Sequence, residues 1–103
     1  MNINVDKSII SECIKHYGKE MQLIVCMEEL SELSQAISKE IRSKGDRNNL
    51  VEEMAGVIIC LENLKQIFAV TNTDIEEWVN FKQERVVKRM NTEKNCKLSL
   101  YIE

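Results

Sequence analysis

An uninterrupted helical pattern runs over residues 19–44, KEMQLIVCMEELSELSQAISKEIRSK. Large apolar side chains recur along one side of this segment at the three- and four-residue spacing of an α-helix. These residues are Leu23, Met27, Leu30, Ile37 and Ile41. Gly18 precedes the segment and Gly45 follows it, and glycine is common at helix ends because it adopts positive φ angles at low cost. The pattern predicts one long helix with this apolar face turned toward the core.

A shorter helix is expected before the long one. The apolar spacing is helical from a start near Asn4 or Asp6 up to Gly18. The chain has no proline, three glycines, one Trp, two Tyr and two Phe. These are too few turn residues and aromatic residues for a β-sandwich. A chain of 103 residues is long enough for one compact domain, so residues 1–103 are expected to form a single all-α domain.

Two more helices are expected after the long one, each with a capping signal at its start. Asn49 is followed three residues later by Glu52, which is the spacing of a capping box, and the helical pattern continues to about residue 70. Thr73 and Glu76 repeat this spacing and predict a fourth helix that ends near residue 91. The expected architecture is therefore a four-helix protomer.

Two features of the sequence bear on assembly: the C-terminal tail and the amount of apolar helix surface. Residues 92–103 are expected to form a C-terminal tail, in which residues 97–102 alternate polar and apolar side chains and suit a short strand or a docked tail. Four helices of this length carry more apolar surface than one small domain covers. Association into an oligomer is therefore expected, and a monomeric four-helix bundle is the alternative.

Charge and hydropathy exclude several classes of protein. Charged residues make up 30% of the chain, but the net charge is only -3, so no basic field for nucleic acid is present. The longest apolar run, residues 55–61, is far shorter than the roughly 20 residues of a membrane span. The four cysteines form no CxxC pair and are expected to be buried thiols rather than a disulfide framework or a zinc site. We expect a cytoplasmic protein that binds neither nucleic acid nor membrane.

A second face of the long helix carries carboxylates. Its residues follow one another at helical spacing: Gln22, Val25, Glu29, Glu32 and Ala36. Val25 and Ala36 flank the two acids, so this face is expected to pack against another element. Glu28 lies at its border, and three acids within one turn repel one another unless a cation is present. A solvated acidic face is the alternative.

Charged residues also fall on the apolar faces of the third and fourth helices. Glu53 lies within an apolar stripe, where an unpaired carboxylate is costly. Lys82 lies on the apolar face of the fourth helix, with Arg85 and Arg89 on either side of that face. A buried salt bridge between Glu53 and Lys82 is one interpretation. Taken together, inward acids and cations suit a polyphosphate with Mg²⁺ or Mn²⁺, since oxygen ligands favour these ions over zinc.

Two acidic segments resemble the motifs of a known family. Residues 28–32, EELSE, resemble the EExxE motif of the MazG-like all-α nucleoside triphosphate pyrophosphatases, and residues 52–56, EEMAG, resemble their ExxD motif. Residues 17–22, YGKEMQ, look like the break before the metal-binding helix, and residues 82–85, KQER, look like the basic segment of the fourth helix. The likeness covers most of the chain. It implies Mg²⁺-dependent hydrolysis of a nucleoside triphosphate to the monophosphate and pyrophosphate, carried out by a dimer or tetramer.

The resemblance also implies a role for each matching residue. The metal ligands would be Glu29, Glu32 and Glu53. Glu28 would orient the attacking water, Lys82 and Arg85 would neutralise phosphate charge, and Gln22 would contact the nucleotide. Gly56 stands where the family has its aspartate, which removes one carboxylate from the site. Two alternatives follow from this departure: a nucleotide- or metal-binding protein with weakened catalysis, and a helical interaction protein.

Overall fold

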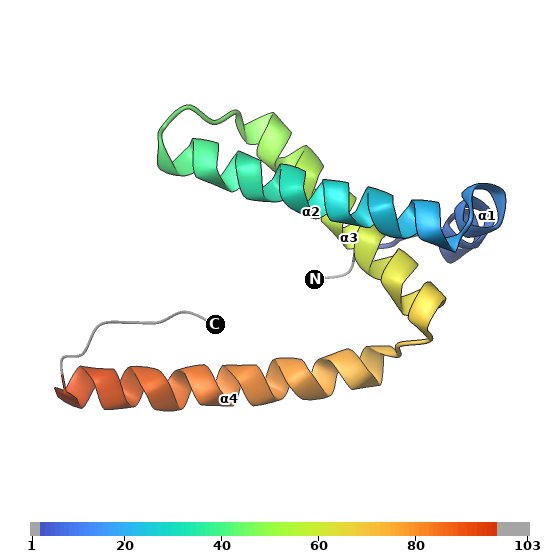
Figure 1. Ribbon diagram of the computed structural model, residues 1–103. Helices are drawn as coiled ribbons and strands as arrows, with labels where there is room; N and C mark the ends of the chain where they lie inside the picture. The colour runs from blue at the N-terminus through green and yellow to red at the C-terminus, as the bar shows by residue number, and fades with distance from the viewer. Residues whose placement is uncertain (1–2, 97–103) are drawn as a thin grey trace. The chain divides into compact units, whose positions relative to one another are not determined.

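The computed structural model describes residues 3–96, with side chains described for residues 3–94. Within this range it contains four helices (Figure 1). The chain divides into two compact units between residues 69 and 70. The first unit holds α1 (Lys7–Tyr17), α2 (Lys19–Ile41) and α3 (Arg47–Phe68), and the second holds α4 (Asn72–Cys96). The predicted all-α class with four helices is confirmed. That the chain forms a single domain stays a prediction.

The ends of α1 follow the sequence prediction. The carboxylate of Asp6 accepts hydrogen bonds from the hydroxyl of Ser8 at 2.6 Å and from its backbone N–H at 3.0 Å. These bonds lower the pKa of Asp6 and cap the helix. Gly18 ends α1 with a φ of 91°, and its N–H donates to the carbonyl of Ile14 at 2.8 Å. Gly18 is the only residue between α1 and α2. Its positive φ, which glycine adopts at low cost, allows the chain to change direction there.

The connection between α2 and α3 lies earlier in the chain than predicted. α2 ends at Ile41, three residues before the expected end, and Ser43 then adopts a φ of 56°. Asp46 caps α3, since its carboxylate accepts a hydrogen bond from the backbone N–H of Asn48 at 2.9 Å. The predicted cap at Asn49 is therefore wrong, because Asp46 already satisfies a free N–H of the first turn.

α4 is longer than predicted at both ends. The Asp74 N–H donates to the Thr71 hydroxyl oxygen at 3.1 Å, and the Thr71 N–H donates to the Asp74 carboxylate at 2.9 Å. This reciprocal pair lowers the pKa of Asp74 and caps the helix two residues before the predicted cap at Thr73. The helix continues to Cys96, so the tail expected from residue 92 is helical up to that point. Residues 97–103, with the predicted strand or docked tail, lie outside the described residues.

α2 and α3 run side by side in opposite directions (Figure 1). Cys26 and Cys60 face each other within this pair, and each thiol donates to the other residue's backbone carbonyl, at 3.7 and 3.9 Å. Burial, together with the hydrogen bond to Cys26, raises the pKa of Cys60 to about 12. One turn further along the pair, Glu29 lies against Gly56. The register thus brings the acidic segments of the two helices together.

The buried face of α2 differs from the predicted one. The residues that the structure buries are Gln22, Cys26 and Ala36. Met27 and Ile41, which were expected to face the core, are 70% and 79% exposed, and Leu30 and Ile37 are also exposed. Two of the three, Cys26 and Ala36, have small side chains, and Cys26 lies in the contact with α3.

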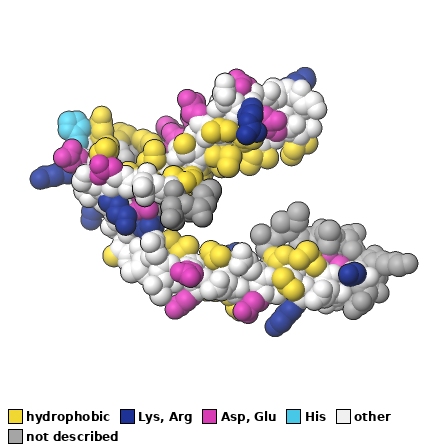
Figure 2. Space-filling view, turned by 180° about the vertical axis from the view of Figure 1, so that it is seen from behind, with side chains coloured by type: hydrophobic (Ala, Val, Ile, Leu, Met, Phe, Trp, Pro, Cys, Tyr) yellow, Lys and Arg dark blue, Asp and Glu magenta, His cyan; other side chains and the backbone are white. Residues whose placement is uncertain are grey.

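Hydrophobic side chains are exposed over both units (Figure 2). They include Met27 on α2, Met54 on α3 and Trp78 on α4. Despite this apolar surface, no helix within residues 3–96 is both long and apolar enough to span a membrane.

Candidate metal centre

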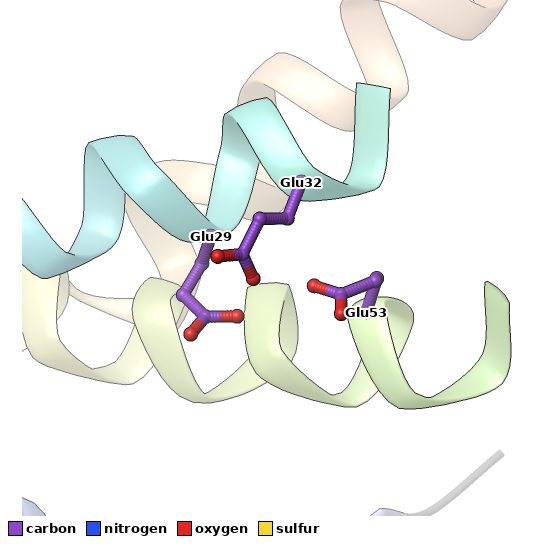
Figure 3. Close-up of side chains that lie close together, drawn as sticks. All are labelled: Glu29, Glu32 and Glu53. Atoms are coloured by element: carbon purple, nitrogen blue, oxygen red, sulfur yellow. The ribbon is translucent and has the colours of Figure 1, made fainter. Parts of the chain in front are cut away.

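Three carboxylates meet between α2 and α3. Glu29 and Glu32 lie one turn apart on α2, and Glu53 points toward them from α3 (Figure 3). One oxygen atom of each residue lies within 4.8 Å of the corresponding oxygens of the other two. Glu29 is half-buried, Glu32 is exposed and Glu53 is only 9% exposed. The structure therefore buries Glu53, as its place in an apolar stripe predicted.

Negative charge accumulates around Glu53. Burial raises the pKa of its carboxyl group, and a hydrogen bond with Glu32 and the charges of Glu32, Glu29 and Glu52 raise it further. Within residues 3–69 the only ion pair joins Lys65 to Glu62, at 2.8 Å. The carboxylates therefore have no salt-bridge partner within the described part of the first unit. Neutralisation of Glu53 by Lys82 stays a prediction, since Lys82 belongs to the second unit.

The donor set fits a small hard cation. Mg²⁺ binds oxygen ligands at about 2.0–2.1 Å, so ligands on opposite sides of the ion lie about 4.2 Å apart. The three carboxylate oxygens lie within 4.8 Å of one another, so rotation of the side chains would have to bring at least two of the oxygen pairs to about 2.9 Å, the spacing of adjacent ligands. The nearby thiol of Cys60 has a pKa of about 12 and stays protonated at neutral pH, so it is a poor metal ligand. All the available donors are thus oxygen atoms, which favours Mg²⁺ or Mn²⁺ over zinc.

Gly56 gives Glu29 the room to reach this cluster. Gly56 is half-buried, and a Cβ atom added there would fall on the Oε2 atom of Glu29 and would lie 3.1 Å from its Cδ. Any side chain at position 56 would therefore compete with the Glu29 carboxylate for the same space. The position that the resemblance gives to a metal-binding aspartate thus adjoins the carboxylate cluster.

The other predicted site residues lie elsewhere. Glu28 is exposed on α2, beside the cluster in sequence. Gln22 is buried two turns before Glu29 and lines a separate cavity, so the structure does not bring it to the carboxylates. On α4, Lys82 is exposed, and Arg85 is half-buried with its guanidinium 5.1 Å from the ring centre of Phe81. The predicted inward direction of Lys82 stays a prediction, since Lys82 belongs to the second unit.

Comparison of the chain with protein-family models, curated proteins and solved structures found no match. The interpretation of the site therefore rests on its geometry and on residues 28–32 and 52–56.

Asn63 is a buried polar residue that was not predicted, and it is only 5% exposed on α3. The sequence signal was its position three residues after Cys60, on the same mainly apolar face of the helix. Cys26 and Cys60 are buried as expected, while Cys13 is half-buried.

Proposed function

We propose that this chain is a Mg²⁺-dependent nucleoside triphosphate pyrophosphohydrolase that converts an NTP or dNTP to the monophosphate and pyrophosphate. The convergence of Glu29, Glu32 and Glu53 is the observation that carries the proposal. Burial raises the pKa of Glu53, and the neighbouring carboxylates of Glu32 and Glu29 raise it further, so the cluster creates a local demand for positive charge. The two acidic segments also resemble motifs of pyrophosphatases that use Mg²⁺ for this reaction.

The proposed reaction is attack of water on the α-phosphorus with pyrophosphate as the leaving group. When bound, the cation would neutralise phosphate charge and acidify water in its coordination shell. Glu28 is proposed to accept a proton from the attacking water and to orient it. Lys82 and Arg85 are proposed to donate charge-assisted hydrogen bonds to the phosphate oxygens, where negative charge develops. The role of Gln22 in nucleotide binding loses support, because Gln22 lines a different cavity.

We also propose that the chain works as a homodimer or homotetramer. Met27, Trp78 and Phe81 are among the large apolar side chains that are at least half exposed. Burying such surface in an interface is worth about 25 cal/mol per Å², which favours association. Size-exclusion chromatography with light scattering tests this, and a monomer over the micromolar range would contradict it.

The matched pair Glu53→Gln and Glu52→Gln tests the activity. Glu52 is the neighbouring acid on α3 and is exposed, so its substitution changes the charge without removing a member of the cluster. Pyrophosphate release is measured with Mg²⁺ and a panel of standard and modified triphosphates. We expect Glu53→Gln to abolish release and Glu52→Gln to retain most of it. The proposal fails if the wild-type chain turns over none of them and shows no Mg²⁺-dependent nucleotide binding.

Gly56 favours a second candidate function, the binding of a nucleotide or metal without efficient hydrolysis. With three carboxylates in place of four, the site has fewer charges with which to hold the cation. A nonhydrolysable triphosphate with Mg²⁺ would then raise the melting temperature, because a ligand that binds only the folded state stabilises it. Stabilisation without pyrophosphate release supports this function. The absence of both effects supports the third interpretation, a helical interaction protein.

A further inference from the structure

One side of α4 carries an apolar stripe along most of the helix. Its members recur at spacings of four and seven residues and so lie on one face: Ile75, Val79, Val86 and Met90. Ile75, Val79 and Met90 are between 39% and 50% exposed, and Val86 is half-buried. In the described part of the second unit, residues 70–96, α4 is the only helix or strand. Because most helices depend on packing of an apolar face for their stability, a partner that covers this stripe would stabilise α4.

The charges of α4 are divided along its length. Residues 72–83 contain three acids and one lysine, whereas residues 84–96 contain two acids and four cations. The helix dipole favours acids in the first turn and cations in the last turn, but its effect fades beyond those turns. Arg85 and Lys88 lie at least two turns before the end of α4 at Cys96, so the dipole does not explain them. Opposite net charges on the two halves favour an antiparallel contact with a second α4, since a parallel contact would bring like charges together.

Glu76 and Lys94 lie on the same border of the stripe. They are 18 residues apart, which is five helical turns, so they project from the same side of the helix. Both residues are exposed. Within one helix they are about 27 Å apart and cannot interact. In an antiparallel pair of α4 helices, however, Glu76 of each copy can lie beside Lys94 of the other copy, and the same register brings Val79 beside Met90.

We propose that α4 is a contact between two copies of this chain, which pair antiparallel with Glu76 of one copy beside Lys94 of the other. This contact rests on the proposed homodimer, for which it supplies the surface, and does not involve the proposed hydrolysis. Burial of the stripe contributes affinity, and the two equivalent charge pairs select the antiparallel orientation. Lys82 lies at the edge of the stripe, where its long side chain can extend past the contact into solvent.

Charge reversal tests this orientation in the full chain. Self-association is measured by sedimentation velocity over a range of concentrations at low ionic strength. We expect Glu76→Lys and Lys94→Glu each to weaken it about tenfold, because each variant places like charges together at both ends of the pair. The double variant Glu76→Lys/Lys94→Glu should recover the wild-type affinity, since it only exchanges the two charges. Glu77→Lys is the matched control, because it makes the same charge change on the opposite side of α4 and should leave association unchanged.

A carbodiimide provides a second measurement, because it joins a carboxylate to an amine without a spacer. It should couple Glu76 to Lys94 in a covalent dimer of the wild-type chain, and mass spectrometry identifies the joined peptides. Circular dichroism verifies that each variant stays helical. The proposal is overturned if the wild-type chain is monomeric, or if the double variant does not recover the association that the single variants lose. A dimer whose affinity none of these substitutions changes also overturns it, while the proposed homodimer would then stand on another surface.

Discussion

Replacing Gly56 by alanine should separate the helix-forming role of this position from its role in making room for Glu29. The new Cβ atom would fall on the Glu29 carboxylate, 3.1 Å from its Cδ and 3.9 Å from its Cγ. These atoms form the end of a flexible side chain, so Glu29 can rotate away while α3 stays in place. We expect its carboxylate to leave the neighbourhood of Glu32 and Glu53.

This movement affects stability and metal binding in opposite directions. In a helix interior, alanine is more favourable than glycine by about 0.5–1 kcal/mol. The free energy of unfolding without metal should rise by about this amount, which corresponds to about 2–8 °C in melting temperature for a small domain. Displacement of one of three ligands should weaken Mg²⁺ binding at least tenfold, because even changes in the outer shell of a metal site cost about 10–100-fold.

Urea unfolding in EDTA and calorimetric titration with Mg²⁺ measure the two effects separately. Gly56→Asp is the comparison, because its own carboxylate would take the space that Glu29 gives up. We expect Gly56→Asp to bind Mg²⁺ more tightly and to turn over faster than Gly56→Ala, while its metal-free stability changes little or falls. Unchanged Mg²⁺ affinity in Gly56→Ala would refute a ligand role for Glu29. A loss of more than about 1 kcal/mol in metal-free stability would show that Glu29 cannot move aside.

Three further substitutions test other parts of the structure. The pKa of Glu53 is raised above its ordinary value of 4.5. Its protonated carboxyl group therefore contributes fully to the metal-free stability below pH 4.5, and this contribution is lost as pH rises through the folded-state pKa. Glu53→Gln should remove this dependence, as measured by urea unfolding between pH 4 and 8 in EDTA. Lys82→Ala should weaken nucleotide binding more than Mg²⁺ binding in titrations, and more than Lys65→Ala does, because Lys65 already pairs with Glu62. Ala36→Leu should destabilise the chain by about 1–3 kcal/mol in urea unfolding, because Ala36 is 2% exposed; an unchanged midpoint would disprove tight packing there.

Helix number and approximate helix ends could be predicted from local chemistry. Gly18 ends α1 because the chain there needs a positive φ, and that requirement is visible in the sequence. The caps at Asp46 and Thr71 were missed in favour of later capping-box patterns. Several residues near each helix start can accept the same free N–H groups, and sequence spacing does not say which one does.

The packed face of α2 was harder to predict than its helical state. Met27 and Ile41 were expected inside because they are large and apolar, but the structure buries Cys26 and Ala36, and Cys26 contacts Cys60 of α3. A hydrophobic pattern identifies an apolar face, whereas the distance between two helices decides which side chains fit between them. Glu53 could be placed correctly because an acid within an apolar stripe has few ways to avoid burial. The surroundings of Lys82 depend on what α4 packs against, and the spacing of apolar residues in the sequence does not determine that.

The thiol of Cys60 offers a way to follow the separation of α2 from α3. Its pKa of about 12, against an ordinary 9.0, means about a thousandfold less thiolate at neutral pH. Iodoacetamide reacts with thiolates, so alkylation of Cys60 requires the two helices to move apart and let water in. A cation held by Glu29, Glu32 and Glu53 would tie the same two helices together and slow this reaction. Metal binding would then be recorded as a labelling rate at a sulfur atom that the metal does not touch.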